Sequence, residues 1–396
     1  MQVLTLLTLL QVTATACVLA LTALAPIVAA DLGIGEHWIG YQISLIYFFG
    51  IFISAFAGSI VARFGAARLA RLELLLFGGG IALVALGRLE TIVLASVLFG
   101  FGYGINNPVS SELLHRVAPQ GRQSLIFSVK QSGVPLGAVV ANVVLPGIAY
   151  AFGLPWQLAV LWLAGGAALL FIPLSKTFRP RPGITRPPLS RAMLSDMIAD
   201  QKYMLQSPAQ RVLAVLGGLY SAAQLIVTAF VVVTLVAQGW STLAAGTVAA
   251  GMQTMGAVGR IGWGWVADRF GAFQVLAFIG AAITCCAVMV MMITALPGWL
   301  QAAVFVVMGA VVSGWNGVML AATAQTAPPG QVGRNTGAVL VYTFLGVIIG
   351  PSIFAAIYGV IGAYPACFAL VALCGGVGAV MAWNARNTLQ RTPAAA

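Results

Sequence analysis

Two cations stand inside long apolar stretches of this sequence, Lys130 and Arg260. If those stretches cross a membrane, each cation costs at least about 2.5–3.5 kcal/mol on insertion scales, so each is expected to face a cavity or a partner. A guanidinium offers a two-pronged set of donors that matches a carboxylate, whereas an ammonium acts as a point charge. Arg260 and Lys130 are therefore candidate anion-binding residues.

We expect no carboxylate at the depth of these cations. At 1.5 Å per residue, Lys130 lies roughly 10 Å and Arg260 roughly 7 Å from the centres of their spans, on the same side. Asp268 lies about 12 Å further along its helix, and Glu112 falls near a helix end. The expected cavity is net positive and suits an anion. The alternative is that both side chains extend to the interface, which Lys130 does more easily.

A second set of candidates is polar or aromatic and lies at mid-span. Buried amides in lipid need partners, so these residues are expected to face the protein interior, where they either contact a bound solute or join helices. The set comprises Tyr47, Asn106, Asn107, Gln131, Tyr220, Gln224, Trp315 and Asn316, with Gln11, Thr15 and Tyr342 as weaker members.

The composition requires a lipid environment around these residues. The 396 residues are 61% hydrophobic and 7% charged, whereas soluble domains carry roughly 25% charged residues. The apolar runs are continuous and about 20 residues long, which indicates helices rather than the alternating strands of a barrel. The net charge of +11 is spread between the runs, which argues against nucleic-acid binding.

Metal and cofactor chemistry find little support in the sequence. The five cysteines lie in apolar stretches without the spacing of a metal site or a disulfide framework. An intramembrane enzyme would need a nucleophile and a base together at mid-span, and the sequence offers no such pair. We therefore expect no cofactor, no metal and no enzymatic activity.

Glycines, prolines and charged residues between the apolar runs divide the chain into twelve expected membrane helices. We interpret the first apolar run as a membrane helix and not as a cleavable signal peptide. A polar, Pro-containing linker over 175–210 separates a six-helix bundle at 1–174 from another at 211–396. The predicted fold is an all-α polytopic membrane protein. The expected spans are 3–29, 38–62, 70–87, 91–115, 124–150, 155–174, 211–237, 242–267, 273–295, 298–324, 335–361 and 364–385.

Most of the 19 Lys and Arg residues fall on one side of these spans. The excess of positive charge on cytoplasmic loops predicts that both termini and the linker are cytoplasmic. A bacterial inner membrane is the expected location.

The two halves repeat one another in sequence, which predicts a duplicated six-helix unit with a binding site near the midplane. Three pairs of segments match in the same order. They are Gly58–Gly65 with Gly264–Gly271, Ala118–Gly121 with Ala327–Gly330, and Gly133 and Gly137 with Gly346 and Gly350.

These segments resemble the major facilitator superfamily over essentially the whole chain. The family pattern G-x-x-x-D-R-x-G is complete at Gly264–Gly271, whereas the first copy, Gly58–Gly65, has Ala62 in place of the aspartate. The resemblance implies that this loop latches the cytoplasmic side of the outward-facing state. The implied gating residues are Gly58, Arg63, Gly264, Asp268 and Arg269.

The stretch Gly259–Asp268 is similar to that of monocarboxylate transporters and of the oxalate–formate exchanger. The resemblance implies that Arg260 meets a substrate carboxylate. The sequence differs from these transporters at two positions, so the resemblance does not imply their substrate or their proton coupling for this chain. Gly256 stands where monocarboxylate transporters carry an acid, and Lys130 lies in span 124–150, whereas the exchanger's second cation lies on its eleventh helix.

We therefore expect a secondary transporter that moves a small organic anion, a mono- or dicarboxylate, by exchange or proton-linked symport. The expected partners are the lipid bilayer, the anion and protons, and the expected state is a monomer. The alternative is an exporter of lipophilic drug-like compounds, favoured by the Gly346–Pro351 run. Two buried cations disfavour cationic drugs for that exporter.

Overall fold

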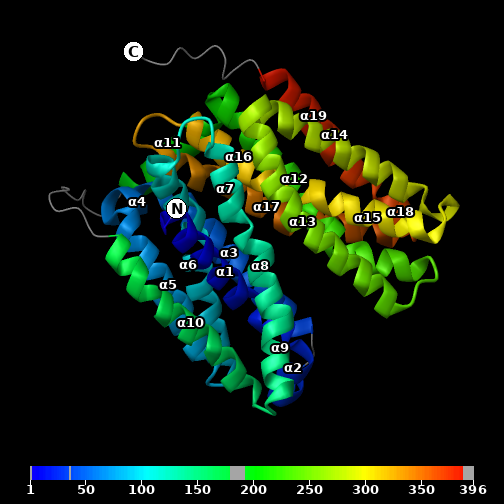
Figure 1. The fold of residues 1–396 in the computed structure, drawn as a ribbon, viewed down its shortest axis with the longest axis horizontal. Coiled ribbons are helices and arrows are strands. Elements are labelled where there is room, and N and C mark those ends of the chain that lie inside the picture. Colours follow the sequence, from blue (N-terminus) through cyan, green and yellow to red (C-terminus); the bar gives the residue numbers. More distant parts are fainter. Residues whose placement is uncertain (1, 35–36, 179–191, 387–396) are drawn as a thin grey trace. The chain divides into compact units, whose positions relative to one another are not determined.

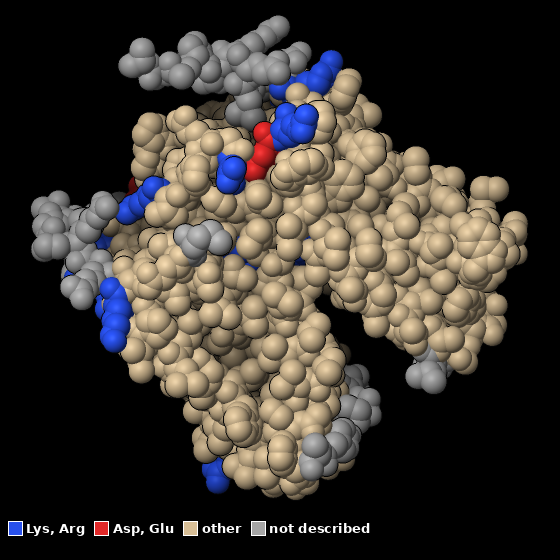
Figure 2. Space-filling view, in the orientation of Figure 1, with Lys and Arg blue, Asp and Glu red and all other residues tan. Residues whose placement is uncertain are grey.

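The computed structural model describes residues 2–34, 37–178 and 192–386. All regular secondary structure in these ranges is helical (Figure 1), which confirms the predicted fold class. The face drawn in Figure 2 consists almost entirely of uncharged residues, as expected for a surface in contact with lipid.

The described residues of the first half, up to the expected linker, form a series of helices, several of which are interrupted. In chain order its helices are α1 (Gln2–Ala23), α2 (Ala25–Leu32), α3 (His37–Ala55), α4 (Ala57–Phe64), α5 (Ala66–Val84), α6 (Leu89–Val117), α7 (Gln123–Gln131), α8 (Gly133–Val139), a π-helical turn (Val140–Val144), α9 (Leu145–Ala151) and α10 (Trp156–Thr177).

The expected linker contains α11 (Ala192–Gln206), a helix that the sequence analysis did not predict. The Pro-rich part of the linker, 179–191, lies outside the described residues. The second half then contains α12 (Pro208–Ala237), α13 (Thr242–Phe270), α14 (Ala272–Met291), a 3₁₀ turn (Ile293–Ala295), α15 (Gly298–Val312), α16 (Trp315–Gln325), α17 (Val332–Ile361), α18 (Tyr364–Cys367) and α19 (Ala369–Ala385).

Within the described residues, nine helical segments are long and apolar enough to span a membrane, or ten when α3 and α4, bent by 65°, count as one span. The other two expected spans correspond to α5 and α13. These helices carry the ionisable residues Glu73 and Arg260, both of which are buried inside the protein. Burial in the bundle, away from lipid, makes such residues tolerable in a spanning helix.

Residue contacts divide the chain into two compact units. The first comprises 1–117, 130–201 and 328–341, and the second comprises 118–129, 202–327 and 342–396. In the first unit, α6 packs against α3 and α5, and α1 packs against α8. In the second unit, α19 packs against α12 and α14. The segments 118–129 and 328–341 are repeat-related, since each precedes one pair of matching glycines.

Glycines allow close helix contacts in both units, and α13 offers a clear case. A methyl group added at Gly259 would lie 2.3 Å from the carbonyl oxygen of Ala310 on α15, whereas one added at Gly262 meets no atom within 4 Å. Gly259 therefore allows the backbones of α13 and α15 to approach closely, which is how helices associate where no hydrophobic effect drives them together.

This difference predicts opposite effects for two substitutions on one helix. Gly259→Ala should destabilise the protein by about 1–3 kcal/mol because it overpacks the α13–α15 contact. Gly262→Ala should be neutral or stabilise the helix by up to about 1 kcal/mol. Thermal unfolding in detergent measures both, and equal melting temperatures for the two variants would contradict this assignment.

Candidate functional site

Lys130 lies at the centre of a buried amide cluster in the first unit. Its Nζ donates to the side-chain oxygens of Gln11 at 2.6 Å, Asn107 at 2.7 Å and Asn106 at 2.8 Å. These residues come from α1, α6 and α7, and Lys130 is 1% exposed. An ammonium has three N–H donors, and three amide oxygens match that number. The predicted candidates Lys130, Asn106 and Asn107 are thus brought together.

The expectation that no carboxylate lies near this depth is wrong. Glu73 on α5 is fully buried, and its Oε2 accepts a hydrogen bond from Asn106 Nδ2 at 2.9 Å. Asn106 therefore joins Glu73 to Lys130. The signal was present in the sequence, because Glu73 is an ionisable residue inside the expected span 70–87, and such residues are functional candidates by default.

Gln131 and Tyr47 are two further candidates in the first unit. Gln131 donates from Nε2 to Asn107 Oδ1 at 3.2 Å, which places it within the cluster. Tyr47 on α3 packs edge-on against the ring of Tyr103 on α6, with ring centroids 5.9 Å apart. The weaker candidate Thr15 accepts a hydrogen bond from Gln11.

In the second unit, three predicted candidates contact one another. Trp315 Nε1 donates to Gln224 Oε1 at 3.1 Å, and the rings of Trp315 and Tyr220 lie 6.2 Å apart. The Tyr220 hydroxyl donates to the backbone carbonyl of Leu276 at 2.8 Å. Tyr220 is fully buried, so it fastens α12 to α14. Asn316 is half-buried on α16.

Arg260 lies on α13 in the same unit and is 3% exposed. Its helix is held to α15 by the close approach at Gly259 and by a hydrogen bond from Trp263 Nε1 to the Ala310 carbonyl at 3.0 Å. These contacts lie on both sides of Arg260 in sequence, so the packing of α13 on α15 fixes the backbone position of this residue.

The predicted gating residue Asp268 caps another helix. Its carboxylate accepts from the backbone N–H of Ser124 at 2.7 Å and of Leu125 at 2.9 Å, at the start of α7. The first N–H groups of a helix have no partner within it and carry partial positive charge, so a carboxylate there is favourable. Gly264 allows this approach, because an added methyl would lie 2.5 Å from Ser128.

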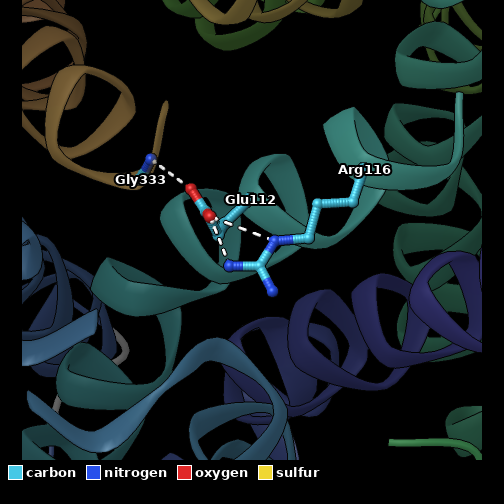
Figure 3. A network of polar contacts seen from close by, with 3 residues as sticks. All are labelled: Glu112, Arg116 and Gly333. Atoms are coloured by element: carbon cyan, nitrogen blue, oxygen red, sulfur yellow. Dashed lines mark hydrogen bonds and ion pairs between the residues drawn. The ribbon is translucent and has the colours of Figure 1, made fainter. Parts of the chain in front are cut away.

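The first unit has a matching cap that comes from a different position. Glu112 on α6 accepts from the backbone N–H of Gly333 at 3.1 Å, at the start of α17, and pairs with Arg116 one turn further along α6 (Figure 3). α7 and α17 are repeat-related, so both starts are capped by a carboxylate. Ala62 stands where the family pattern has an aspartate, and Glu112, which caps α17, is not among the predicted gating residues.

The first-half glycine Gly58 lies beside an ion pair from α11 and α17. Arg334 Nε donates to Asp200 Oδ1 at 2.9 Å, and a methyl added at Gly58 would lie 2.7 Å from Asp200. Burial raises the pKa of the Asp200 carboxyl, and Arg334 offsets part of this rise. The free-energy cost of desolvating Asp200 therefore offsets part of the stability that the ion pair with Arg334 contributes.

The remaining gating candidates behave alike in the two halves. The Arg63 guanidinium lies 5.5 Å from the ring of Phe64, and that of Arg269 lies 5.9 Å from the ring of Phe270. The glycines that follow, Gly65 and Gly271, both have positive φ, which only glycine adopts without strain.

Known proteins share this sequence pattern along most of its length. The family description "Major Facilitator Superfamily" matches residues 4–351. The chain belongs to the major facilitator superfamily. The superfamily consists of membrane transporters, so the predictions of a multi-pass membrane protein and of a transporter are confirmed.

Solved structures of this superfamily share the fold. The fucose:proton symporter of E. coli is 15% identical, with 96% of this chain and 98% of that chain covered and a TM-score of 0.78. The human organic anion transporter MFSD10 is 13% identical, with 96% and 99% covered and a TM-score of 0.78. At such low identity these superfamily members show the fold alone.

A curated relative matches a shorter part of the chain. The H(+)/hexose cotransporter 2 of Parachlorella kessleri is 32% identical over 130 residues, which is 33% of this chain and 24% of that protein. The match spans about a quarter of the length of this superfamily relative.

The cap at α7 leads to a stability prediction. Asp268→Ala should lower the free energy of unfolding by about 1–3 kcal/mol, because two backbone N–H groups lose a charged acceptor. Asp196→Ala, on the exposed side of α11, is the matched control and should change it by less than about 0.5 kcal/mol. Unfolding in detergent compares the two, and a control as damaging as Asp268→Ala would argue against the cap.

Proposed function

We propose that this transporter moves a small organic anion bearing a carboxylate, and that Arg260 binds the carboxylate. The observation that carries the proposal is a guanidinium only 3% exposed on α13, a helix that we propose spans the membrane. A guanidinium at this depth costs several kcal/mol unless its charge is balanced. Its fork of N–H donors can bind a carboxylate in a bidentate arrangement.

The charge of the second half supports an anionic solute. Residues 202–396 contain one acidic residue, Asp268, and its carboxylate is engaged by the start of α7. A carboxylate solute would supply negative charge to this half without any further acidic side chain. Exchange of one anion for another, or symport of the anion with a proton, would then drive transport along a gradient.

A neutral, hydroxyl-rich solute is a second candidate. The amide cluster of Gln11, Asn106, Asn107 and Gln131 favours it, because amides both donate and accept hydrogen bonds with hydroxyl groups. The named fucose and hexose transporters carry sugars with protons. The lipophilic exporter is the third alternative to be tested.

The remaining expectations complete the proposal. The protein would act as a monomer in a bacterial inner membrane, with both termini and the 175–210 linker in the cytoplasm. The bundles at 1–174 and 211–396 would form its two transport domains. Protease protection of tags placed at the two termini would test this orientation.

The anion proposal predicts ligand stabilisation that depends on Arg260. Acetate, lactate, oxalate and succinate would be screened by thermal shift in detergent, alongside fucose and a lipophilic cation. A ligand at a hundredfold excess over its Kd stabilises the folded state by about 2.7 kcal/mol. Arg260→Ala should weaken carboxylate binding at least tenfold, about 1.4 kcal/mol, because it removes the anion's main hydrogen-bond donor.

Arg211→Ala, at an exposed position of α12, is the matched control and should leave carboxylate binding unchanged. Stabilisation by fucose alone would favour the neutral solute. Stabilisation by the lipophilic cation alone, unchanged in Arg260→Ala, would favour the exporter and overturn the anion proposal.

A further inference from the structure

A buried carboxyl in the first unit has one oxygen without a hydrogen bond. Glu73 is fully buried on α5. Its Oε2 accepts from Asn106 at 2.9 Å, whereas its Oε1 has no hydrogen-bond partner among the described residues. An ionised carboxylate with an unsatisfied buried oxygen is costly, and a proton on Oε1 would remove the charge.

Asn106 connects this carboxyl to a cation. Its amide nitrogen donates to Glu73 and its amide oxygen accepts from Lys130 at 2.8 Å. The amide orientation therefore follows from its two neighbours, an acid on one end and an ammonium on the other. Glu73, Asn106 and Lys130 form a buried hydrogen-bonded array, called here the Glu73 array.

The hydrogen-bond acceptors around Lys130 suit an ammonium group. Three amide oxygens lie within 2.8 Å of its Nζ. An ammonium supplies three N–H donors for three acceptors, whereas a neutral amine supplies two. The proton that can come and go from the Glu73 array is therefore the one on Glu73.

The helices packed against α5 place few other ionisable groups near Glu73. Those helices are α1, α4, α6 and α10. Lys130 on α7 is connected to Glu73 through Asn106, which hydrogen-bonds both side chains. The other titratable side chains of α5 and its neighbours, mostly near helix ends, are Arg68 and Arg71 on α5, Cys17 on α1, Arg63 on α4, Glu90, Tyr103, Glu112, His115 and Arg116 on α6, and Lys176 on α10.

We propose that Glu73 is a proton-binding site and that its protonation sets the charge of the Glu73 array. With Glu73 ionised, the array is neutral, because Lys130 carries one positive charge. Transfer of a proton from hydronium to Glu73 breaks an O–H bond of the hydronium, forms an O–H bond at Oε1, and leaves a water molecule and an array with a charge of +1. No electron moves.

This charge change deepens the proposed function and rests on it for its role in transport. A proton taken up together with a monoanion adds no net charge to the protein. Proton uptake at Glu73 would therefore balance the charge of the transported anion, and the return of Glu73 to its ionised form would accompany release of the anion. The proton site itself does not depend on the identity of the solute.

The proton site is tested without any transported solute, by pH-difference infrared spectroscopy of the protein in lipid membranes. A carboxyl that binds a proton gains an absorption band of the protonated acid as the pH falls. Wild type should have a band of a buried carboxylic acid that is lost in Glu73→Gln. Gln is isosteric with Glu and keeps an oxygen that accepts from Asn106.

Glu90→Gln, at the exposed start of α6, is the matched control and should keep the buried band. A second variant, Lys130→Gln, retains the carboxyl and should shift the pH at which the band develops, because the neighbouring charge is gone. A wild-type spectrum without the band, or a band that survives in Glu73→Gln, would overturn the proposal. An unshifted band in Lys130→Gln would overturn the link to Lys130.

Proton flux then tests the link to transport. Carboxylate uptake into proteoliposomes under a pH gradient should fall at least tenfold in Glu73→Gln, while exchange of internal for external carboxylate persists. Uptake that still follows the pH gradient in Glu73→Gln would overturn the coupling. If none of the four carboxylates is transported by wild type, the anion proposal fails, whereas the infrared result still decides the proton site.

Discussion

The cost of burying charge in a hydrocarbon environment controls the polar structure of this protein. Only 7% of the residues are charged, and the buried Lys130 and Glu73 both contact amide side chains. Lys130 is surrounded by amide oxygens, and Glu73 is joined to it through Asn106. Each contact replaces hydration that the bilayer cannot provide. The candidate site is therefore also the place where the fold is most constrained.

The same cost explains why the repeat-related helices α7 and α17 are both capped. Their first N–H groups carry partial positive charge and have no partner within the helix. The second half supplies Asp268 from the duplicated loop, whereas the first half, which has Ala62 there, uses Glu112 from α6. Duplication preserved the electrostatic requirement at both helix starts, and the residue that meets it differs.

Close helix packing gives these polar contacts fixed positions. Gly259 allows α13 to approach α15 closely, and Gly264 allows α13 to approach Ser128 on α7. Lipid tails do not drive helices together, so small residues at the contacts and interhelical hydrogen bonds must hold them. A guanidinium such as Arg260 is then presented from a rigid helix, which a selective site requires.

The sequence by itself determined the helical membrane fold, the duplication and the candidates Arg260 and Lys130, because hydropathy, loop charge and glycine spacing are local signals. Spans with kinks were still found, since a kink leaves the apolar run intact. Tertiary structure alone decided which polar groups meet. Lys130 contacts Gln11 across 119 residues of sequence, and Glu112 contacts Gly333 across 221. No local pattern encodes such contacts, because they depend on how separate helices pack, and for that reason the partners of Glu73 and Glu112 emerged only from the fold.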